Sequence, residues 1–277
     1  MNNAYIPISE FKLALSMILI LITGTISALL QLGLLKSLVW GTVRAFVQLS
    51  IIGSVLMYVF KIDNLAVILV IILLMCWVAS REAIRRTPEA PFNTSVVSFL
   101  ALTASTFIVG LIVVVIIISP EPWYSARISV PIFGMILGNS MNGIALSLDR
   151  MLSEVKAHIE EIEQLVCFGA TPWEAIVPYV RKAVMAGMTP TINGLMVVGL
   201  VSLPGMMTGQ ILAGMDPTEA VRYQFVVMAM VAAAVGIGCL IIVLLSYRRL
   251  FNQDQALVQP AYYSQRPRHN AGKNKLK

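Results

Sequence analysis

Charged residues are scarce in this 277-residue chain. Asp, Glu, Lys and Arg together account for 12% of it, whereas hydrophobic residues account for 58% and the mean hydropathy is +0.82. Because charged residues make up roughly a quarter of an ordinary soluble domain, this composition excludes that class and predicts an integral membrane protein. The net charge of +6 is divided among several short loops, so it indicates membrane orientation and predicts no nucleic-acid partner.

Groups that catalyse reactions or bind metals are equally few. The chain has two histidines, His158 and His269, and three cysteines without CxxC spacing, Cys76, Cys167 and Cys239. This inventory argues against a zinc site, a disulfide framework and a hydrolase of the Ser-His-Asp or HExxH type. We expect the three cysteines to be buried thiols and His158 to lie on a solvated helix face.

A phosphate-binding loop is also missing. The pattern G-x-x-x-x-G-K-[ST] does not occur, and the single Gly-Lys pair, Gly272-Lys273, lies near the C-terminus. We therefore expect this chain to bind no ATP or other cofactor and to have no enzymatic activity of its own. If ATP is used, it must be hydrolysed by another subunit.

Long apolar runs dominate what is present. About 20 apolar residues cross the hydrocarbon core of a bilayer as a helix, so an all-α, polytopic membrane protein is predicted. Seven segments qualify as spans: 11–33, 38–60, 64–80, 94–119, 128–148, 189–214 and 223–247. The first lacks a basic leader and a cleavage site, so we interpret it as a span and not as a removable signal.

The distribution of basic residues predicts the orientation. With seven spans and an external N-terminus, sixteen of the twenty Lys and Arg residues are cytoplasmic, as the positive-inside rule requires. The third segment is short and could be re-entrant, but without it Arg81, Arg85 and Arg86 would lie on the wrong side. We divide the chain into a membrane domain, 1–251, and a basic cytoplasmic tail, 252–277, that we expect to be disordered and at most to touch anionic membrane lipids.

One long hydrophilic segment, 149–188, separates the fifth and sixth spans. Its first half has a helical apolar stripe, with the acidic residues expected on the opposite, solvated face. The stripe is Met151, Val155, Ile159, Ile162 and Val166, and the acidic residues are Glu154, Glu160, Glu161 and Glu163.

A sharply specified turn follows this helix. Gly169 should end it, Thr171 and Glu174 form a T-x-x-E capping box, and Pro172 suits the first position of a new helix. The turn would expose Phe168, Ala170, Thr171 and Trp173 to the cytosol. Either a partner docks there, or the aromatic rings anchor in the lipid headgroups.

Polar and helix-breaking residues inside the spans are candidates for a transport pathway or gate, because both are costly in a bilayer. The asparagines could instead bond neighbouring helices, and Arg44 could extend to the interface. Pro204 and Gly205 interrupt the sixth span beside two methionines, whose thioethers suit soft ions; no metal-ligand set is recognisable. The candidates are Arg44, Gln48, Asn139, Met141, Asn142, Asn193, Ser202, Pro204, Gly205, Met206 and Met207.

Four motifs carry a resemblance to known transporters. "E-x-L-x-x-x-G-A-T-P-x-x-A" at 163–175, followed by Arg181, resembles the coupling loop of ABC-transporter permeases. "WGTVRAFVQL" at 40–49, "GMILGNSM" at 134–141 and "GLVSLPGMMTGQILAGMDPTEAVRYQ" at 199–224 resemble the Fet-type iron-export permease family, to which plant aluminium-tolerance permeases are similar. The resemblance extends from about residue 36 to 251.

The resemblance implies a permease that exports iron, another metal ion or a chelate across the bacterial cytoplasmic membrane. It implies a homodimer that binds two copies of a separate ABC ATPase, which would hold ATP and Mg. It places ATPase docking at Phe168, Gly169, Ala170, Thr171, Pro172, Trp173, Glu174 and Arg181. A secondary transporter or a membrane scaffold or receptor remains the alternative; the first would need an ionisable relay in the spans, and the second would need no broken helix.

Overall fold

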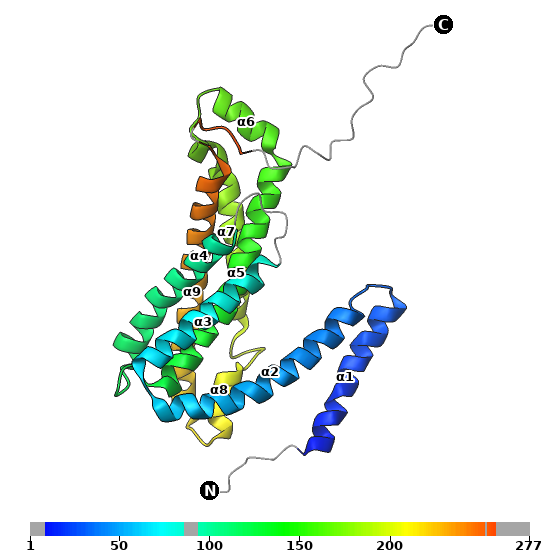
Figure 1. Ribbon diagram of the computed structural model, residues 1–277, viewed down its shortest axis with the longest axis vertical. Helices are drawn as coiled ribbons and strands as arrows, with labels where there is room; N and C mark the ends of the chain where they lie inside the picture. The colour runs from blue at the N-terminus through cyan, green and yellow to red at the C-terminus, as the bar shows by residue number, and fades with distance from the viewer. Residues whose placement is uncertain (1–8, 86–93, 253, 259–277) are drawn as a thin grey trace.

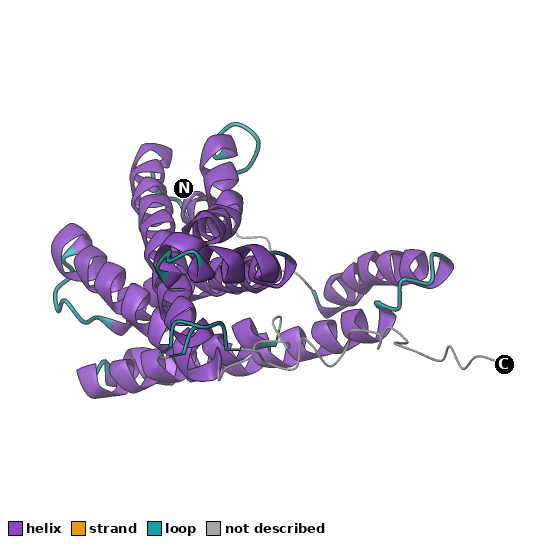
Figure 2. Ribbon diagram, turned by 90° about the horizontal axis from the view of Figure 1, so that it is seen from above, coloured by secondary structure: helices purple, strands orange, loops and turns teal. Residues whose placement is uncertain are grey.

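The computed structural model describes residues 9–85, 94–252 and 254–258, and this part of the chain is helical without a β-strand (Figures 1 and 2). The all-α prediction is confirmed. The helices are α1 (Glu10–Leu29), α2 (Leu35–Ile62), α3 (Leu65–Ile84), α4 (Thr94–Leu111) with a π-helical continuation (Ile112–Ile118), α5 (Ala126–Ala157), α6 (Ile159–Cys167), α7 (Pro172–Val197), α8 (Gly205–Leu212) and α9 (Pro217–Leu250).

Local capping explains several helix boundaries. Asn64 Oδ1 accepts a hydrogen bond from Ala66 N at 2.9 Å at the start of α3, and Asp216 Oδ1 accepts one from Thr218 N at 2.8 Å at the start of α9. Such side-chain acceptors satisfy N–H groups that a helix leaves free at its first turn. Pro217 then occupies the first helical position, where its missing N–H costs nothing.

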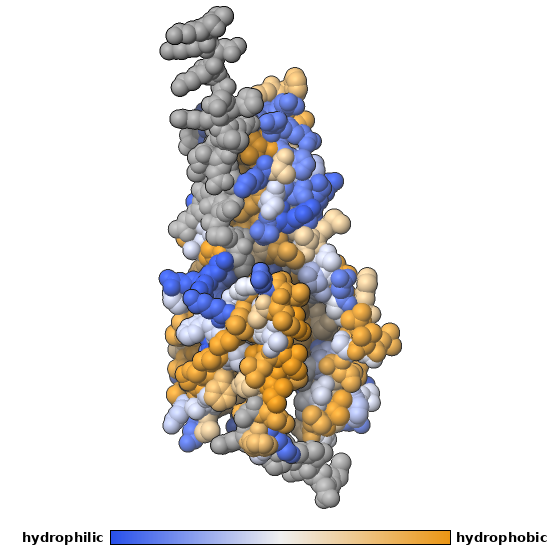
Figure 3. Space-filling model, turned by 90° about the vertical axis from the view of Figure 1, so that its right-hand side faces the viewer, coloured by the Kyte–Doolittle hydropathy of each residue, from blue (hydrophilic) through white to orange (hydrophobic). Residues whose placement is uncertain are grey.

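Six helices in the described ranges are long and apolar enough to cross a membrane: α1, α2, α3, α4 with its continuation, α5 and α9. They coincide with six of the seven predicted spans. The short third segment, predicted as 64–80, is a complete helix of 20 residues. Figure 3 shows hydrophilic residues gathered over the end of the molecule that carries α6 and hydrophobic residues predominating below it.

The sixth predicted span, 189–214, is broken as predicted, but its helices have other bounds. α7 begins at Pro172 and runs without interruption to Val197, so the predicted second helix of the hydrophilic segment and the first part of this span are one helix. Residues 198–204 are not helical, and Gly199 has a φ of +82°, a conformation that favours glycine. The interruption predicted at Pro204 and Gly205 is present, but it starts earlier, and Pro204 caps the short helix α8.

A bundle of α3, α4, α5, α7 and α9 forms the core, with α5 at its centre packed most extensively on α7 and α9. The three helices meet closely where small residues face one another. A Cβ added at Gly187 of α7 would lie 2.7 Å from Gly143 O of α5 and 2.6 Å from Cys239 Sγ of α9. The absence of a side chain on Gly187 therefore allows the α5–α7–α9 contact.

This contact supplies a stability prediction. We expect Gly187→Ala to lower the free energy of unfolding by about 1–3 kcal/mol, because the added methyl cannot fit without moving backbone atoms. The matched control is Gly53→Ala in α2, where none of the described residues lies within 4 Å of the added Cβ. Thermal unfolding of both variants in detergent would test this, and equal midpoints would contradict it.

The hairpin of α1 and α2 stands apart from the bundle in Figure 1, and most of its side chains are exposed. Asp63, at the end of α2, ties it to the bundle by accepting a hydrogen bond from Ala126 N at 2.7 Å. At the other end of the chain, Leu257 forms a backbone bridge with Phe251. The rest of the predicted tail, from residue 259, and the loop containing Arg86 lie outside the described residues.

Candidate functional site

The turn between α6 and α7 has the predicted geometry. Gly169 has a φ of +95°, and the capping box is complete: Thr171 Oγ1 accepts from Glu174 N at 3.3 Å, while Glu174 Oε2 accepts from Thr171 N at 2.8 Å. The backbone N–H of Thr171, with the help of its hydroxyl, lowers the pKa of Glu174. The start of α7 is therefore stabilised by a capping box that includes the ionised Glu174 and is formed entirely by residues 171–174.

The aromatic side chains of this turn differ in their surroundings. Phe168 is 88% exposed, whereas the ring of Trp173 packs edge-on against Tyr247 of α9, with ring centroids 5.3 Å apart. Trp173 therefore belongs partly to the bundle, and Phe168 is the protruding group. Cys167 is also exposed, so the prediction of three buried thiols is wrong at this position; Cys76 and Cys239 are buried.

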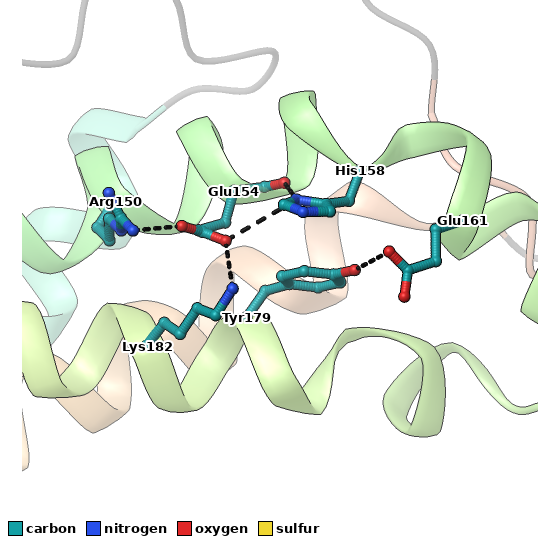
Figure 4. Close-up of polar contacts among 6 residues, drawn as sticks. All are labelled: Arg150, Glu154, His158, Glu161, Tyr179 and Lys182. Carbon is teal, nitrogen blue, oxygen red and sulfur yellow. Dashed lines mark hydrogen bonds and ion pairs between the residues drawn. The ribbon is translucent and has the colours of Figure 1, made fainter.

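A cluster of charged and aromatic side chains joins α5 and α6 to α7 near the α6–α7 turn (Figure 4). We call it the hairpin clamp, after the helical hairpin that α5 and α6 form with α7. It consists of Arg150, Glu154, His158, Glu161, Tyr179 and Lys182. Glu154 of α5 is its centre: Lys182 Nζ of α7 donates to Glu154 Oε2 at 3.0 Å, and Arg150 pairs with Glu154 Oε1. The side chain of Glu154 is only 9% exposed. The prediction that Glu154 lies on a solvated face is therefore wrong, because α7 covers that face.

An aromatic layer lies beside this ion pair. The ring of His158 lies 4.8 Å from the ring of Tyr179 of α7, and its side chain is 37% exposed, so His158 is partly solvated and also packs against α7. Tyr179 Oη donates to Glu161 Oε2 of α6 at 3.0 Å. Burial and the Glu161 carboxylate raise the pKa of Tyr179 to about 12, so this hydroxyl stays protonated and keeps donating. The hairpin clamp thus ties α5, α6 and α7 into one unit.

A cleft of about 680 Å³ opens along α5, α7 and α9, and the start of α8 also lines it. Figure 1 places α8 at the opposite end of the molecule from α6. On α5 the cleft extends from Met135 to Asp149, which at 1.5 Å per residue is about 21 Å, most of the thickness of a hydrocarbon core. The same helix, α7, begins at the capped turn and lines this cleft through Gly187, Pro190 and Thr191.

The structure brings five of the eleven predicted pathway residues to this cleft: Asn139, Asn142, Pro204, Gly205 and Met206. The other six do not line it. Arg44 and Gln48 lie on α2, where Arg44 Nη1 is 3.9 Å from Glu82 Oε2 of α3, and Met141 packs against the core. Asn193 is exposed outside the cleft lining, and neither Ser202 nor Met207 lines it.

Sequence reasoning missed several lining residues: Met135, Asp149, Thr191, Gln224 and Met228. Asp149 and Gln224 lie at the edges of predicted spans, where polar residues are common and do not indicate a site. The packing of α9 against α5 cannot be recognised from the local sequence. Of the lining residues that the structure describes, Asp149 is the only charged one. Among the described residues, no group of three or more His, Cys, Asp or Glu side chains could hold a metal ion.

Comparison with known proteins places this architecture among membrane proteins of one family. The model of the uncharacterised protein family UPF0014 matches residues 10–251. The UPF0014 membrane protein YjkA of Bacillus subtilis is 39% identical over 90% of this chain and 98% of its own length. The probable iron export permease protein FetB of Escherichia coli K12 is 34% identical over 91% of this chain and 95% of its own.

A plant protein is also similar. Protein ALUMINUM SENSITIVE 3 of Arabidopsis thaliana is 30% identical over 74% of both chains. No solved structure matches the chain. The match over nearly all of the helical region, together with these relatives, shows that the chain belongs to the UPF0014 family of membrane proteins.

Proposed function

We propose that this chain is the permease subunit of an ATP-driven exporter, that it works as a homodimer with two copies of a separate ABC ATPase, and that it exports iron or another metal ion or its chelate. The relative named as a probable iron export permease supports the substrate and direction. The missing phosphate-binding loop supports a separate ATPase, which would hold ATP and Mg.

One observation carries the proposal: α7 starts at the capped, Phe168-bearing turn and continues as a single helix into the wall of the cleft. A movement imposed on the turn by an ATPase would therefore reach Pro190 and Thr191 through a continuous helix. The hairpin clamp would add α5, the opposite wall, to the same moving unit. This is the mechanical connection that an ATP-driven permease needs.

Mild detergent extraction of the tagged permease from its native membrane tests the partnership. We expect an ATPase with a phosphate-binding loop to be recovered in equal amount with the permease. Recovery of the homodimer without any ATPase would contradict the proposal and favour a secondary transporter or a scaffold.

The orientation that we propose places the N-terminus outside and the C-terminus and α6 in the cytoplasm of a bacterium, because most basic residues then lie inside. Cys167 is the exposed native thiol, so a membrane-impermeant maleimide applied to intact cells should leave it unlabelled and should label it after permeabilisation. An engineered cysteine at position 123, between α4 and α5, should be labelled in intact cells. The reverse pattern would contradict this orientation.

A further inference from the structure

Asp149 of α5 lines the end of the cleft that is nearer to α6, and it is exposed there. It is also the first residue of the hydrophilic segment 149–188, so in the proposed orientation it marks the cytoplasmic mouth of the cleft. In the part of the chain that the structure describes, its carboxylate makes no hydrogen bond or ion pair. An accessible, uncompensated negative charge therefore stands where a substrate from the cytoplasm would enter.

The charge of the cleft lining has a single sign. Among the lining residues that the structure describes, Lys, Arg and His are absent. Two basic residues of the cleft-forming helices, Arg150 and Lys182, both pair with Glu154 in the hairpin clamp, and neither of them lines the cleft. Because low-dielectric walls focus the field of charges of one sign, a mouth of this kind attracts cations and repels anions.

The uncharged polar groups further along α5 are compatible with a cation as well. Asn142 and Asn139 line the cleft seven and ten residues before Asp149, which at 1.5 Å per residue is about 10 and 15 Å along the helix. Asn139 donates its amide nitrogen to Met135 O at 2.8 Å, so its side-chain oxygen remains available to a ligand. Carboxylate and amide oxygens are ligands of hard metal cations, and the methionine thioethers of the lining are neutral and leave the sign of its charge unchanged.

We propose that Asp149 recruits the substrate at the cytoplasmic mouth of the cleft, and that the substrate enters as a hydrated metal cation and not as an anionic chelate. This inference rests on the proposed transport function and narrows it, because a metal ion and its chelate both fit that function. Metal cations of this class keep part of their hydration shell in weak sites, so one carboxylate is sufficient to attract the ion without chelating it.

Initial rates of ATP-dependent uptake of ferrous iron test the proposal. They are measured without oxygen in inside-out vesicles that contain the permease and its ATPase, because the cytoplasmic mouth then faces the medium. We expect Asp149→Asn to raise KM about three- to tenfold at low ionic strength, the effect of removing one unit charge about 6 Å from a divalent cation in water, and to leave the maximal rate unchanged. Asp149→Glu keeps the charge and should remain close to the wild type.

The dependence on ionic strength separates an effect of charge from an effect of structure. Between about 0.01 and 0.15 M salt the Debye length falls from about 30 to 8 Å, so the KM of the wild type should rise toward that of Asp149→Asn. The KM of the variant should depend on salt less. The matched control is Asp254→Asn, because Asp254 is an exposed aspartate that does not line the cleft, and this variant should behave as the wild type does.

Citrate identifies the form of the metal that enters. Added citrate converts ferrous iron into an anionic complex and lowers the concentration of the free cation. We expect the uptake rate of the wild type to follow the free cation at every citrate concentration.

Three results would overturn this inference while leaving ATP-driven export intact: an unchanged KM in Asp149→Asn, an equal rise of KM in the Asp254→Asn control, or a rate that follows the citrate complex. Absence of ATP-dependent uptake by wild-type vesicles would instead contradict the proposed function, and this inference with it. If Asp149→Asn does not assemble with the ATPase, the wild type decides, because a wild-type KM that is indifferent to salt is also contradictory.

Discussion

Replacing Gly169 by tryptophan is expected to reduce ATPase recovery with the permease at least about tenfold, a loss of about 1.4 kcal/mol or more of binding free energy. In the part of the chain that the structure describes, nothing lies within 4 Å of a Cβ at this position, so the indole would project from the turn into the space that the ATPase must occupy. The measurement is the ratio of ATPase to tagged permease after mild extraction.

Two further variants separate bulk from backbone strain. Gly169 has a φ of +95°, and Gly169→Asn keeps a residue that tolerates this region while adding little volume, so it should retain most of the ATPase. Thr171→Ala removes the cap, at a local cost of about 1 kcal/mol, and should weaken coupling more than assembly. Full recovery with Gly169→Trp would show that the turn is not the docking site and would favour its aromatic rings as membrane anchors.

The second large effect is expected at the hairpin clamp. Glu154→Ala should leave the ATPase bound, because the turn is untouched, but it should reduce substrate-stimulated ATP hydrolysis roughly fivefold or more, within the usual range of coupling energies. Without the carboxylate, Lys182 of α7 and Arg150 of α5 repel each other where they were joined. The two walls of the cleft would then no longer move together.

Glu160→Ala is the matched control for this prediction. Glu160 is an acidic residue of α6 outside the clamp and outside the motif at 163–175, so its removal changes the charge of the segment by the same amount without removing a group that joins Glu154 to Lys182. Stimulation that falls equally in both variants would indicate a general charge effect. Unchanged stimulation in Glu154→Ala would show that the clamp does not transmit the movement.

The sequence predicts those features that depend on neighbours along the chain. The capping box at Thr171 and Glu174 is confirmed because it needs only two residues three positions apart, and the left-handed turn at Gly169 needs only one. Six spans are confirmed because hydropathy over about 20 residues is a local property.

Features that depend on how the helices pack against one another could not be predicted from the local sequence. A solvated face for Glu154 follows from helical periodicity if α5 stands alone, but α7 returns along that face and buries the carboxylate. Likewise, Asn139 and Asn142 line the cleft whereas Arg44 and Gln48 do not, because α5 is central in the bundle and α2 stands apart from it. Nothing in the residues around Gln224 shows that it would line the cleft.

The division of 189–214 shows a further limit. The segment is apolar on average, so hydropathy predicts one span with a break at Pro204 and Gly205, whereas the backbone already leaves the helix at Val198 and resumes it at Gly205. We also did not predict that α7 continues from the hydrophilic segment into the span. Hydropathy changes at this boundary, whereas the backbone hydrogen bonds of the helix continue across it.

ATP-dependent uptake of ferrous iron by inside-out membrane vesicles tests the central proposal most directly. Vesicles that contain the permease and its ATPase should accumulate iron when Mg-ATP is added, and they should not do so with a non-hydrolysable ATP analogue or with the Gly169→Trp permease. Iron accumulation that depends on a proton gradient and not on ATP would contradict an ATP-driven exporter. The proposal would also be contradicted if vesicles containing the assembled permease and ATPase took up no iron, manganese or metal chelate.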